Sequence, residues 1–204
     1  MQFPNAKLLI FAKAPEVGQV KTRLAPALGY EGAARLYTKL LRGTVEHVVR
    51  SKLCAVVCWC APDSAHPVFN QFSEEYGVEL QVQQGEDLGA RMAFAARQGL
   101  AETDAVVLIG ADCPALTEGH LQQVLSWLAA GSDAVLGPAE DGGYVLLGLR
   151  RFHPSLFDNI LWGSDQVLGV TRERLAALNW RWCELETLWD LDRPEDLERY
   201  KNRP

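Results

Sequence analysis

The chain has 204 residues, of which 48% are hydrophobic and 23% are charged. These proportions are typical of a globular protein and exclude a disordered chain. The length suits one α/β domain covering residues 1–204. The formal net charge of -6, with acidic and basic residues mixed along the chain, offers no basic surface to nucleic acid or to an anionic membrane. We therefore expect a small-molecule substrate and no nucleic-acid partner.

The cysteines and the apolar runs indicate the cellular compartment of the protein. Cys54, Cys58 and Cys60 lie on one apolar run, and no later cysteine or histidine pair completes a zinc-binding pattern. This arrangement indicates buried, reduced thiols. No basic segment followed by a long apolar one opens the chain, and no apolar run reaches the length that spans a membrane. We therefore expect a cytoplasmic protein without a membrane span.

Apolar runs rich in β-branched residues alternate with segments of helical periodicity. The predicted strands cover residues 7–12, 54–61, 78–83, 105–111, 134–137 and 144–149, with a closing strand near 183–188. The predicted helices cover residues 31–50, 68–76, 88–101, 118–129 and 166–178. This alternation predicts parallel βαβ units and a mostly parallel central sheet with helices on both faces. Ligands of such sheets bind beyond the carboxyl ends of the strands, so the loops there are of most interest.

The loop after the first strand carries glycine and three cationic side chains. It includes Lys13, Gly18, Lys21 and Arg23. Glycine lets backbone amides approach an anion, while lysine and arginine supply charge and hydrogen-bond donors to phosphate. Neither a P-loop nor a dinucleotide-binding fingerprint is present, because the glycine spacing of both is absent. The loop is thus a candidate phosphate site, and a solvated basic loop is the alternative.

A carboxylate follows the fourth predicted strand, where Asp112 stands two residues before Pro114. One or two carboxylates, with phosphate oxygens and water, are the ligands that Mg²⁺ prefers. Asp112 is therefore a candidate metal ligand. Its alternative role is to cap the turn or the helix that starts near Thr117.

Two later stretches could provide a second carboxylate. Asp141 precedes Gly142 and Gly143, which would let the backbone approach a ligand or simply form a tight turn. Asp190 and Asp192 alternate on an extended segment and should point to the same side. Because neighbouring carboxylates repel unless a cation lies near them, we expect Asp112 and Asp192 to share one divalent ion, with Asp190 as the alternate. The other possible role of Asp192 is as N-cap of a last helix.

Four blocks in this order resemble a known family. They are residues 13–24 (KAPEVGQVKTRL), 110–114 (GADCP), 140–144 (EDGGY) and 190–196 (DLDRPED). Together they are similar to the bacterial GT-A-type glycosyltransferase-like proteins, also called rSAM/selenodomain-associated transferases, over nearly the whole chain. More loosely, they resemble nucleotidylyltransferases such as molybdenum cofactor guanylyltransferase, phospholactate guanylyltransferase and the CMP-sugar synthetases. The resemblance implies the GT-A, or nucleotide-diphospho-sugar transferase, fold.

The resemblance also implies roles for individual residues. It makes Lys21 and Arg23 the catalytic cations, within a substrate-binding loop that includes Lys13, Pro15 and Gly18. It makes Asp112 the metal-binding aspartate, although the DxD motif of many GT-A enzymes is reduced here to one carboxylate, as in the nucleotidylyltransferases. Asp192 or Asp190 would then complete a site for Mg²⁺ or Mn²⁺.

A further block at residues 83–92 matches the part of this fold that holds the base and ribose. Its candidates are Gln84, Gly89 and Arg91, although Asp87 could merely cap the next helix and Arg91 could lie on the solvated side of that helix. Gly142, Gly143 and Asp165 are further substrate-binding candidates, and helix capping is the alternative for Asp165.

Two reactions fit these residues. In the first, an acceptor hydroxyl, deprotonated by Asp141 or Asp165, attacks the sugar of a nucleotide sugar. In the second, a phosphate or hydroxyl attacks the α-phosphate of a nucleoside triphosphate and pyrophosphate leaves. In both, Lys21, Arg23 and the metal would stabilise charge on the leaving phosphates. A non-catalytic nucleotide-binding module is the remaining alternative. The partners are therefore a nucleotide or nucleotide sugar and a small acceptor.

Overall fold

In a computed structural model, described over residues 1–202, seven strands form one sheet in the order β3-β2-β1-β4-β6-β5-β7. All neighbours pair in parallel except β6, which is antiparallel to both β4 and β5. The strands are β1 (Ala6–Lys13), β2 (Ala55–Ala61), β3 (Glu79–Val82), β4 (Ala105–Gly110), β5 (Ala134–Pro138), β6 (Tyr144–Leu149) and β7 (Trp182–Glu184). The predicted mostly parallel sheet is confirmed.

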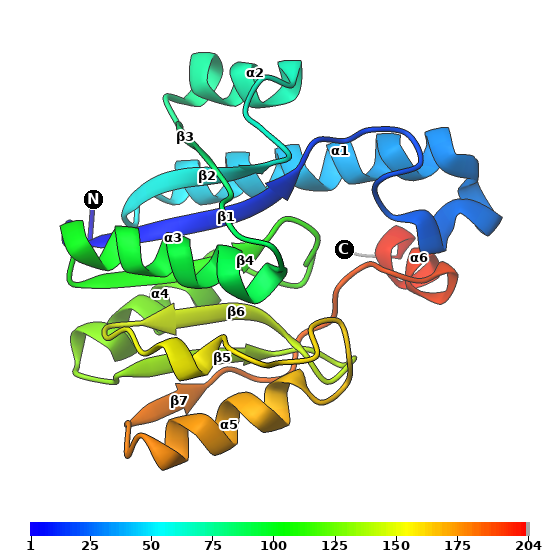
Figure 1. Cartoon of the computed structure of the whole chain (residues 1–204). Helices are drawn as coiled ribbons and strands as arrows, with labels where there is room; N and C mark the ends of the chain where they lie inside the picture. Colours follow the sequence, from blue (N-terminus) through cyan, green and yellow to red (C-terminus); the bar gives the residue numbers. More distant parts are fainter. Residues whose placement is uncertain (203–204) are drawn as a thin grey trace.

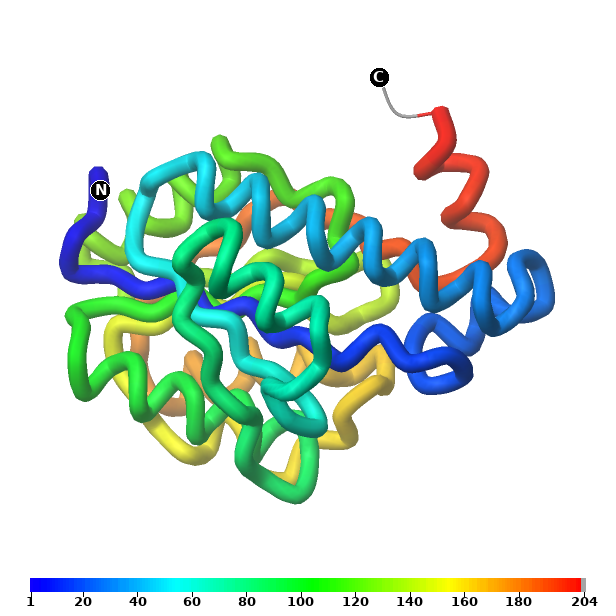
Figure 2. Tube along the Cα trace, turned by 90° about the horizontal axis from the view of Figure 1, so that it is seen from above, coloured from blue at the N-terminus to red at the C-terminus, as the bar shows by residue number. Residues whose placement is uncertain are grey.

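Helices cover both faces of the sheet (Figure 1). One face is packed by α1 (Ala25–Ser51), α2 (Pro67–Tyr76) and α4 (Glu118–Ala129), and the other by α3 (Leu88–Glu102) and α5 (Val167–Ala177). Short 3-10 turns, η1 (Thr22–Leu24) and η2 (Pro154–Leu156), lie in the connections. The last helix, α6 (Pro194–Lys201), does not cover the sheet but packs beside the start of α1 (Figure 2).

The central strands are apolar throughout because helices bury both of their faces. In β4 the residues from Ala105 to Ile109 are all buried, and β5 is buried along its whole length. Continuous apolar runs of this kind are expected of sheets covered on two sides. Burial therefore fixes the middle of the sheet, and the polar residues that follow the strands are left at its edge.

The structure differs from the predicted elements mainly at their ends. The first helix begins at Ala25 rather than residue 31, because Pro26 is well suited to a first turn, and the helix is interrupted at Gly29 (φ 68°, ψ 164°). The closing strand is shorter than predicted and covers Trp182–Glu184, with an isolated parallel bridge between Ala139 and Leu188. No helix of residues 1–202 is long and apolar enough to cross a membrane.

All five cysteines are free thiols, and each except Cys183 is buried. Burial raises the pKa of Cys54 to about 11 and that of Cys113 to about 12. Since the thiolate is the reactive form, these thiols should be slow to react with a disulfide reagent.

We expect a thiol titration with Ellman's reagent at pH 8 to modify no more than Cys183 quickly in the native protein. All five cysteines should react after unfolding in guanidinium chloride. Rapid native reaction of several thiols would show that the core around the buried cysteines opens more readily than their burial indicates.

Candidate functional site

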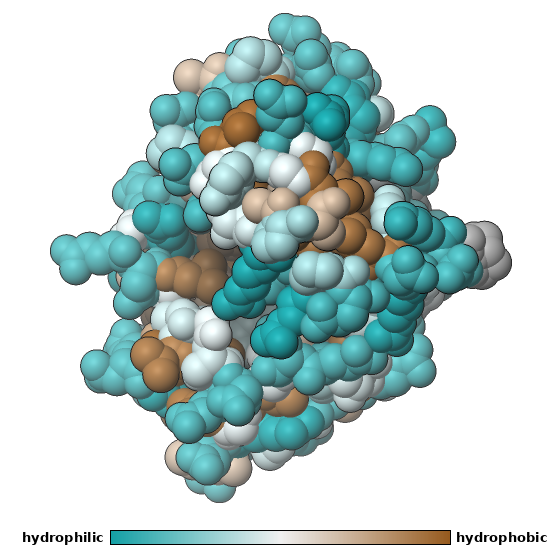
Figure 3. Space-filling view, turned by 90° about the vertical axis from the view of Figure 1, so that its right-hand side faces the viewer, coloured by the Kyte–Doolittle hydropathy of each residue, from teal (hydrophilic) through white to brown (hydrophobic). Residues whose placement is uncertain are grey.

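A cleft of about 490 Å³ opens where the parallel strands end, and Lys13, Lys21, Arg91, Asp112 and Asp192 are among the residues that line it. These residues come from the exits of β1 and β4, from α3, and from the segment before α6. Figure 3 looks onto this edge, where the surface is hollowed near its centre and hydrophilic side chains border the hollow. The sheet topology thus gathers residues that are far apart in sequence.

Lys21 links two of the predicted metal ligands. Its Nζ lies 2.8 Å from Oδ2 of Asp112 and 3.4 Å from Oδ1 of Asp192, and its side chain is only 5% exposed. Arg23 adds a second cation, with Nη1 2.5 Å from Oδ2 of Asp192, but its side chain is 63% exposed. Asp112 and Asp192 therefore lie on either side of one buried ammonium group.

The backbone of the β1–α1 loop is bent to place Lys21. Lys21 adopts the left-handed conformation (φ 48°, ψ 39°), and Gly18 has a φ of 79°. For a residue with a side chain this conformation costs roughly 1–2 kcal/mol, so surrounding contacts must hold it. Such strain is concentrated at functional positions more often than elsewhere.

Asp192 reaches the sheet edge because the chain before α6 is pinned there. The Leu191 amide donates to the Asp112 carbonyl at 3.1 Å, and the Leu191 side chain is fully buried. The Asp196 carboxylate accepts from the amides of Asp192 and Arg193 at 3.0 and 2.7 Å. The last helix therefore anchors a carboxylate beside the exit of β4.

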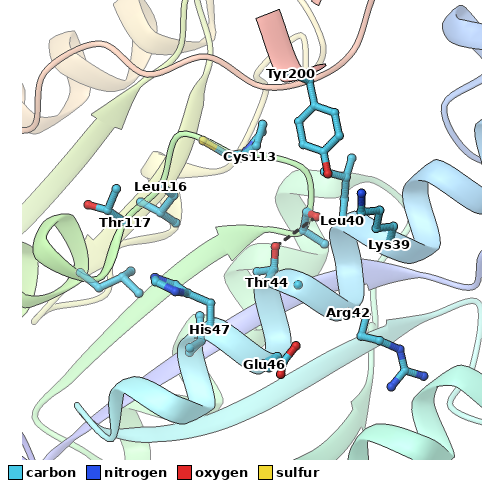
Figure 4. Close-up of a pocket in the computed structure, with 15 residues that line it drawn as sticks. Lys39, Leu40, Arg42, Thr44, Glu46, His47, Cys113, Leu116, Thr117 and Tyr200 are labelled. Atoms are coloured by element: carbon cyan, nitrogen blue, oxygen red, sulfur yellow. Dashed lines mark hydrogen bonds between the residues drawn. The ribbon is translucent and has the colours of Figure 1, made fainter. Parts of the chain in front are cut away.

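The loop that carries Asp112 is supported from behind by α1. The Thr44 hydroxyl donates to the Ala111 carbonyl at 3.3 Å, and the Cys113 thiol donates to the Trp189 carbonyl at 3.3 Å. A second pocket of about 490 Å³ lies on this rear side, where Thr44, Cys113 and Tyr200 are among its lining residues (Figure 4). The loop is thus held by α1 and by the C-terminal segment at once.

The electrostatics of the cleft are those of close carboxylates around one lysine. Burial opposes the charge of Lys21, but Asp112, Asp192 and Asp190 outweigh it, so its pKa is raised. Burial also acts against the charged form of Asp192, yet Lys21 and Arg23 lower its pKa. Burial and then the Asp112 charge raise the pKa of Asp190 to about 6, with Lys21 opposing them. Asp190 therefore lies close to the same group of charges.

The predicted Asp141 loop lies at the same edge and is tightly turned. Asp141 Oδ1 accepts from the Gly143 amide at 2.9 Å, and Gly142 has a φ of 85°. A side chain on Gly142 would approach the Asp165 carbonyl oxygen to 2.3 Å, so glycine lets these two loops touch. Asp141 therefore has the turn role, and its charge also acts on Arg23 and Asp190 near the cleft.

The residues predicted to hold a base are only partly brought together. Arg91 lines the cleft, with Nε donating to the Gly85 carbonyl at 3.0 Å. Gln84 lines a different pocket, of about 280 Å³, on the α3 face of the sheet. Gly89 packs under Trp162, whose Nε1 would lie 2.3 Å from a Cβ added at Gly89. The separation of Gln84 from Arg91 was not anticipated.

Among the residues of the cleft that were not predicted, Gln83 and Tyr37 hold its walls together by hydrogen bonds. Gln83 donates its side-chain amide to the carbonyls of Ala12 and Trp59, at 3.1 and 2.8 Å. Tyr37, from α1, accepts the Lys13 amide with its hydroxyl at 2.9 Å. Strand alternation could have separated Gln83 from Gln84, because successive side chains point to opposite faces. No sequence signal singles out Tyr37 within its helix.

The alternative capping roles have mixed outcomes. Asp87 does cap α3, since its Oδ1 accepts from the Ala90 amide at 2.7 Å. Asp165 is not the cap of α5, because Gln166 occupies that position without a side-chain bond. Asp192 is likewise not the N-cap of α6, because Arg193 is, and the Arg193 amide donates to the Asp196 carboxylate. Thr117 caps α4, so Asp112 does not. Asp112 and Asp192 thus have no capping task.

The donor set fits a hard divalent cation. Asp112 and Asp192 present carboxylate oxygens toward one point, and Mg²⁺ or Mn²⁺ takes oxygen ligands from carboxylates, phosphates and water. Within residues 1–202 no group of three or more histidine, cysteine, aspartate and glutamate side chains stands at metal-binding spacing. Phosphate oxygens and water would therefore have to complete the coordination, and the shared metal remains a prediction.

The topology and the loops at the sheet edge define a GT-A-like nucleotide-diphospho-sugar transferase fold. A family model described as "Uncharacterized protein conserved in bacteria (DUF2064)" matches residues 44–164, and the chain belongs to this family. A provisionally named nucleotide-diphospho-sugar transferase from Desulfovibrio desulfuricans G20 is 32% identical, with a TM-score of 0.89, 98% of this chain covered and 87% of that chain.

More distant structures share the fold alone. A cytidylyltransferase from Leptospira borgpetersenii is 15% identical, with a TM-score of 0.63, 97% of this chain covered and 85% of that one. Glucosyl-3-phosphoglycerate synthase from Mycobacterium tuberculosis, in complex with Mn²⁺ and uridine diphosphate, is 11% identical, with a TM-score of 0.57. The match covers 96% of this chain and 75% of the synthase chain. No curated protein matches the chain. The neighbours include both sugar and nucleotidyl transferases and support a nucleotide-utilising transferase.

The contact between Gly142 and Asp165 can be tested with a matched pair of alanine substitutions. Gly142 and Gly163 both have positive φ values, of 85° and 81°, but a Cβ at Gly163 would meet no atom within 4 Å. G163A therefore measures the conformational cost, and G142A should lose about 1–3 kcal/mol more because the Asp165 loop must move. Urea unfolding of both variants checks this, and equal losses would mean that the loops do not pack as described.

Proposed function

We propose that the chain is a metal-dependent transferase that takes a nucleotide sugar and moves its sugar to a small acceptor. The observation that carries the proposal is the gathering of Lys21, Arg23, Asp112 and Asp192 at the exits of β1 and β4. Cations beside carboxylates in one cleft suit a ligand that is itself a metal-bound diphosphate. The likeness to the Desulfovibrio desulfuricans G20 protein supports sugar transfer as the reaction.

The cations have a defined task in this reaction. As the bond between the sugar and the diphosphate breaks, negative charge grows on the leaving phosphate oxygens, and Lys21 and Arg23 would donate to them. A divalent metal held by Asp112 and Asp192 would add Lewis-acid neutralisation of the same charge. Asp141 would accept the proton of the acceptor hydroxyl from the opposite loop. Lys13, Pro15, Gly18 and Arg91 would line the nucleotide.

A second candidate, nucleotidyl transfer with release of pyrophosphate, is favoured by one specific observation. The loop after β4 has a single carboxylate, Asp112, and takes its partner Asp192 from the C-terminal segment. The solved structures that share the fold include CMP:2-keto-3-deoxy-manno-octonic acid synthetase in complex with CTP. In this reaction the cleft would hold a triphosphate, and a phosphate nucleophile would need no base.

A ligand screen followed by product analysis distinguishes sugar transfer, nucleotidyl transfer and binding without catalysis. Thermal shifts would be measured for nucleoside triphosphates and nucleotide sugars, with and without Mg²⁺ or Mn²⁺. A ligand at a hundred times its dissociation constant adds about 2.7 kcal/mol to stability. Release of a nucleoside diphosphate would support sugar transfer and release of pyrophosphate the alternative. Binding without turnover of any nucleotide would favour a non-catalytic module.

The double variant K21A/R23A should bind its nucleotide at least about tenfold more weakly, because two charge-assisted phosphate contacts are lost. The control is R35A/K52A, which removes the same charge from residues outside the cleft; Arg35 forms a salt bridge with Glu31 on the surface of α1. Calorimetry on the folded variants measures both. Unchanged affinity in K21A/R23A would exclude phosphate binding by this loop.

A further inference from the structure

The Lys21 ammonium lies where a divalent ion shared by Asp112 and Asp192 would have to lie. It contacts Oδ2 of one carboxylate at 2.8 Å and Oδ1 of the other at 3.4 Å, and the lysine side chain is almost fully enclosed. Two cations cannot occupy one place, and close to each other they repel strongly in a partly buried site. Metal binding therefore requires the ammonium to leave.

We propose that Lys21 is an exchangeable placeholder for the metal. It neutralises Asp112 and Asp192 until a diphosphate draws its ammonium away, so that the divalent ion and the diphosphate bind together and each binds weakly alone. This inference rests on the proposed use of a nucleotide, and it assigns Lys21 a positioning role beyond its contact with phosphate.

The need for a placeholder follows from the carboxylates. Asp112, Asp192 and Asp190 lie close enough to act on Lys21 together, and Asp141 lies near enough to act on Asp190. Carboxylates gathered without a cation repel one another and destabilise the fold around them. Lys21 reduces this repulsion in the free protein, and the strained backbone that positions it is the cost of doing so.

Lys21 can leave only if its charge finds another partner. A buried ammonium that loses both carboxylates is left unpaired, and that is strongly unfavourable. Diphosphate oxygens supply new acceptors beside the same loop, while the metal takes over the two carboxylates. Since each ligand removes an obstacle to the other, the coupling between them is favourable and reciprocal.

Arg23 does not prevent this exchange. Within residues 1–202 its guanidinium forms an ion pair with Asp192 alone, and its side chain is 63% exposed, so it can move into solvent or onto phosphate at little cost. Lysine also suits the role of a mobile cation better than arginine, because its ammonium is a compact charge on a flexible stem. The alternative is that Lys21 replaces the metal permanently and the protein needs no divalent ion.

The proposal is tested first by metal affinity without any nucleotide. Free Mn²⁺ would be followed by electron paramagnetic resonance in the wild type and in K21M. We expect K21M to bind Mn²⁺ about tenfold or more tightly than the wild type, within the usual range of site coupling. Added Mn²⁺ should also raise the melting temperature of K21M more than that of the wild type.

The matched control is K13M, which removes the same charge from the end of β1, beside the same cleft. Lys13 lines the cleft but forms no ion pair within residues 1–202, so its loss should leave the Mn²⁺ affinity within about twofold. Equal affinity for Mn²⁺ in K21M and the wild type would overturn the placeholder role. An equal gain in K13M would overturn it too, because bulk charge would then explain the effect.

A second experiment needs no variant, in case K21M does not fold. Wild-type crystals would be soaked with Mn²⁺ alone and with Mn²⁺ plus pyrophosphate, and the metal located by anomalous scattering. We expect Mn²⁺ between Asp112 and Asp192 only in the second soak, with Lys21 Nζ turned to pyrophosphate. Pyrophosphate bound while Lys21 still bridges both carboxylates would overturn the proposal in favour of permanent replacement.

These results separate the placeholder from the proposed function. The change in Mn²⁺ affinity of K21M involves no nucleotide and stands even if the substrate is of another class. Failure of every nucleotide and nucleotide sugar to bind, with pyrophosphate still bound and a clear gain in the Mn²⁺ affinity of K21M, would remove the transferase proposal alone. Nucleotide turnover that depends on Mn²⁺, with no gain in the Mn²⁺ affinity of K21M, would remove the placeholder alone.

Discussion

The ion pairing of Lys21 with Asp112 and Asp192 connects three parts of the chain that are distant in sequence. The lysine belongs to the β1–α1 loop, one carboxylate follows β4, and the other precedes α6. A buried charge is tolerated only where it is paired, so each of these segments is constrained by the other two. The pinned Leu191 and the supporting Thr44 serve the same arrangement from its two sides.

The strands and the layers could be predicted from the sequence, because each buried face of a strand or helix requires apolar residues at a regular spacing. The apolar run of β4 and the helical period of α3 each reflect a face that must be covered. The antiparallel β6 was not assigned a direction in advance, although the tight Gly142–Gly143 turn before it is the local cause. Element ends were less accurate, since Gly29 interrupts a helix that resumes at once.

The candidate site was predictable in part, for the same topological reason. Parallel strands place their carboxyl ends at one edge, so Lys21 and Asp112 could be expected there from the strand pattern alone. Asp192 was a candidate from the residues alone, and the family resemblance strengthened it, because no periodicity predicts where a C-terminal segment docks. The placing of Gln84 in a separate pocket could have been inferred from strand alternation. The presence of Tyr37 in the cleft depends on how α1 docks on the sheet, which the sequence does not encode locally.

A lysine between the carboxylates also affects when a divalent metal can enter the site. A preformed pair of bare carboxylates would attract any divalent ion, whether or not a substrate were present. A covalently attached cation raises the threshold for metal entry and leaves the donor geometry intact, so the oxygen ligands are oriented before the substrate arrives. The strain at Lys21 is then explained as the conformational cost of holding a charge that is meant to be exchanged, rather than as a defect of the loop.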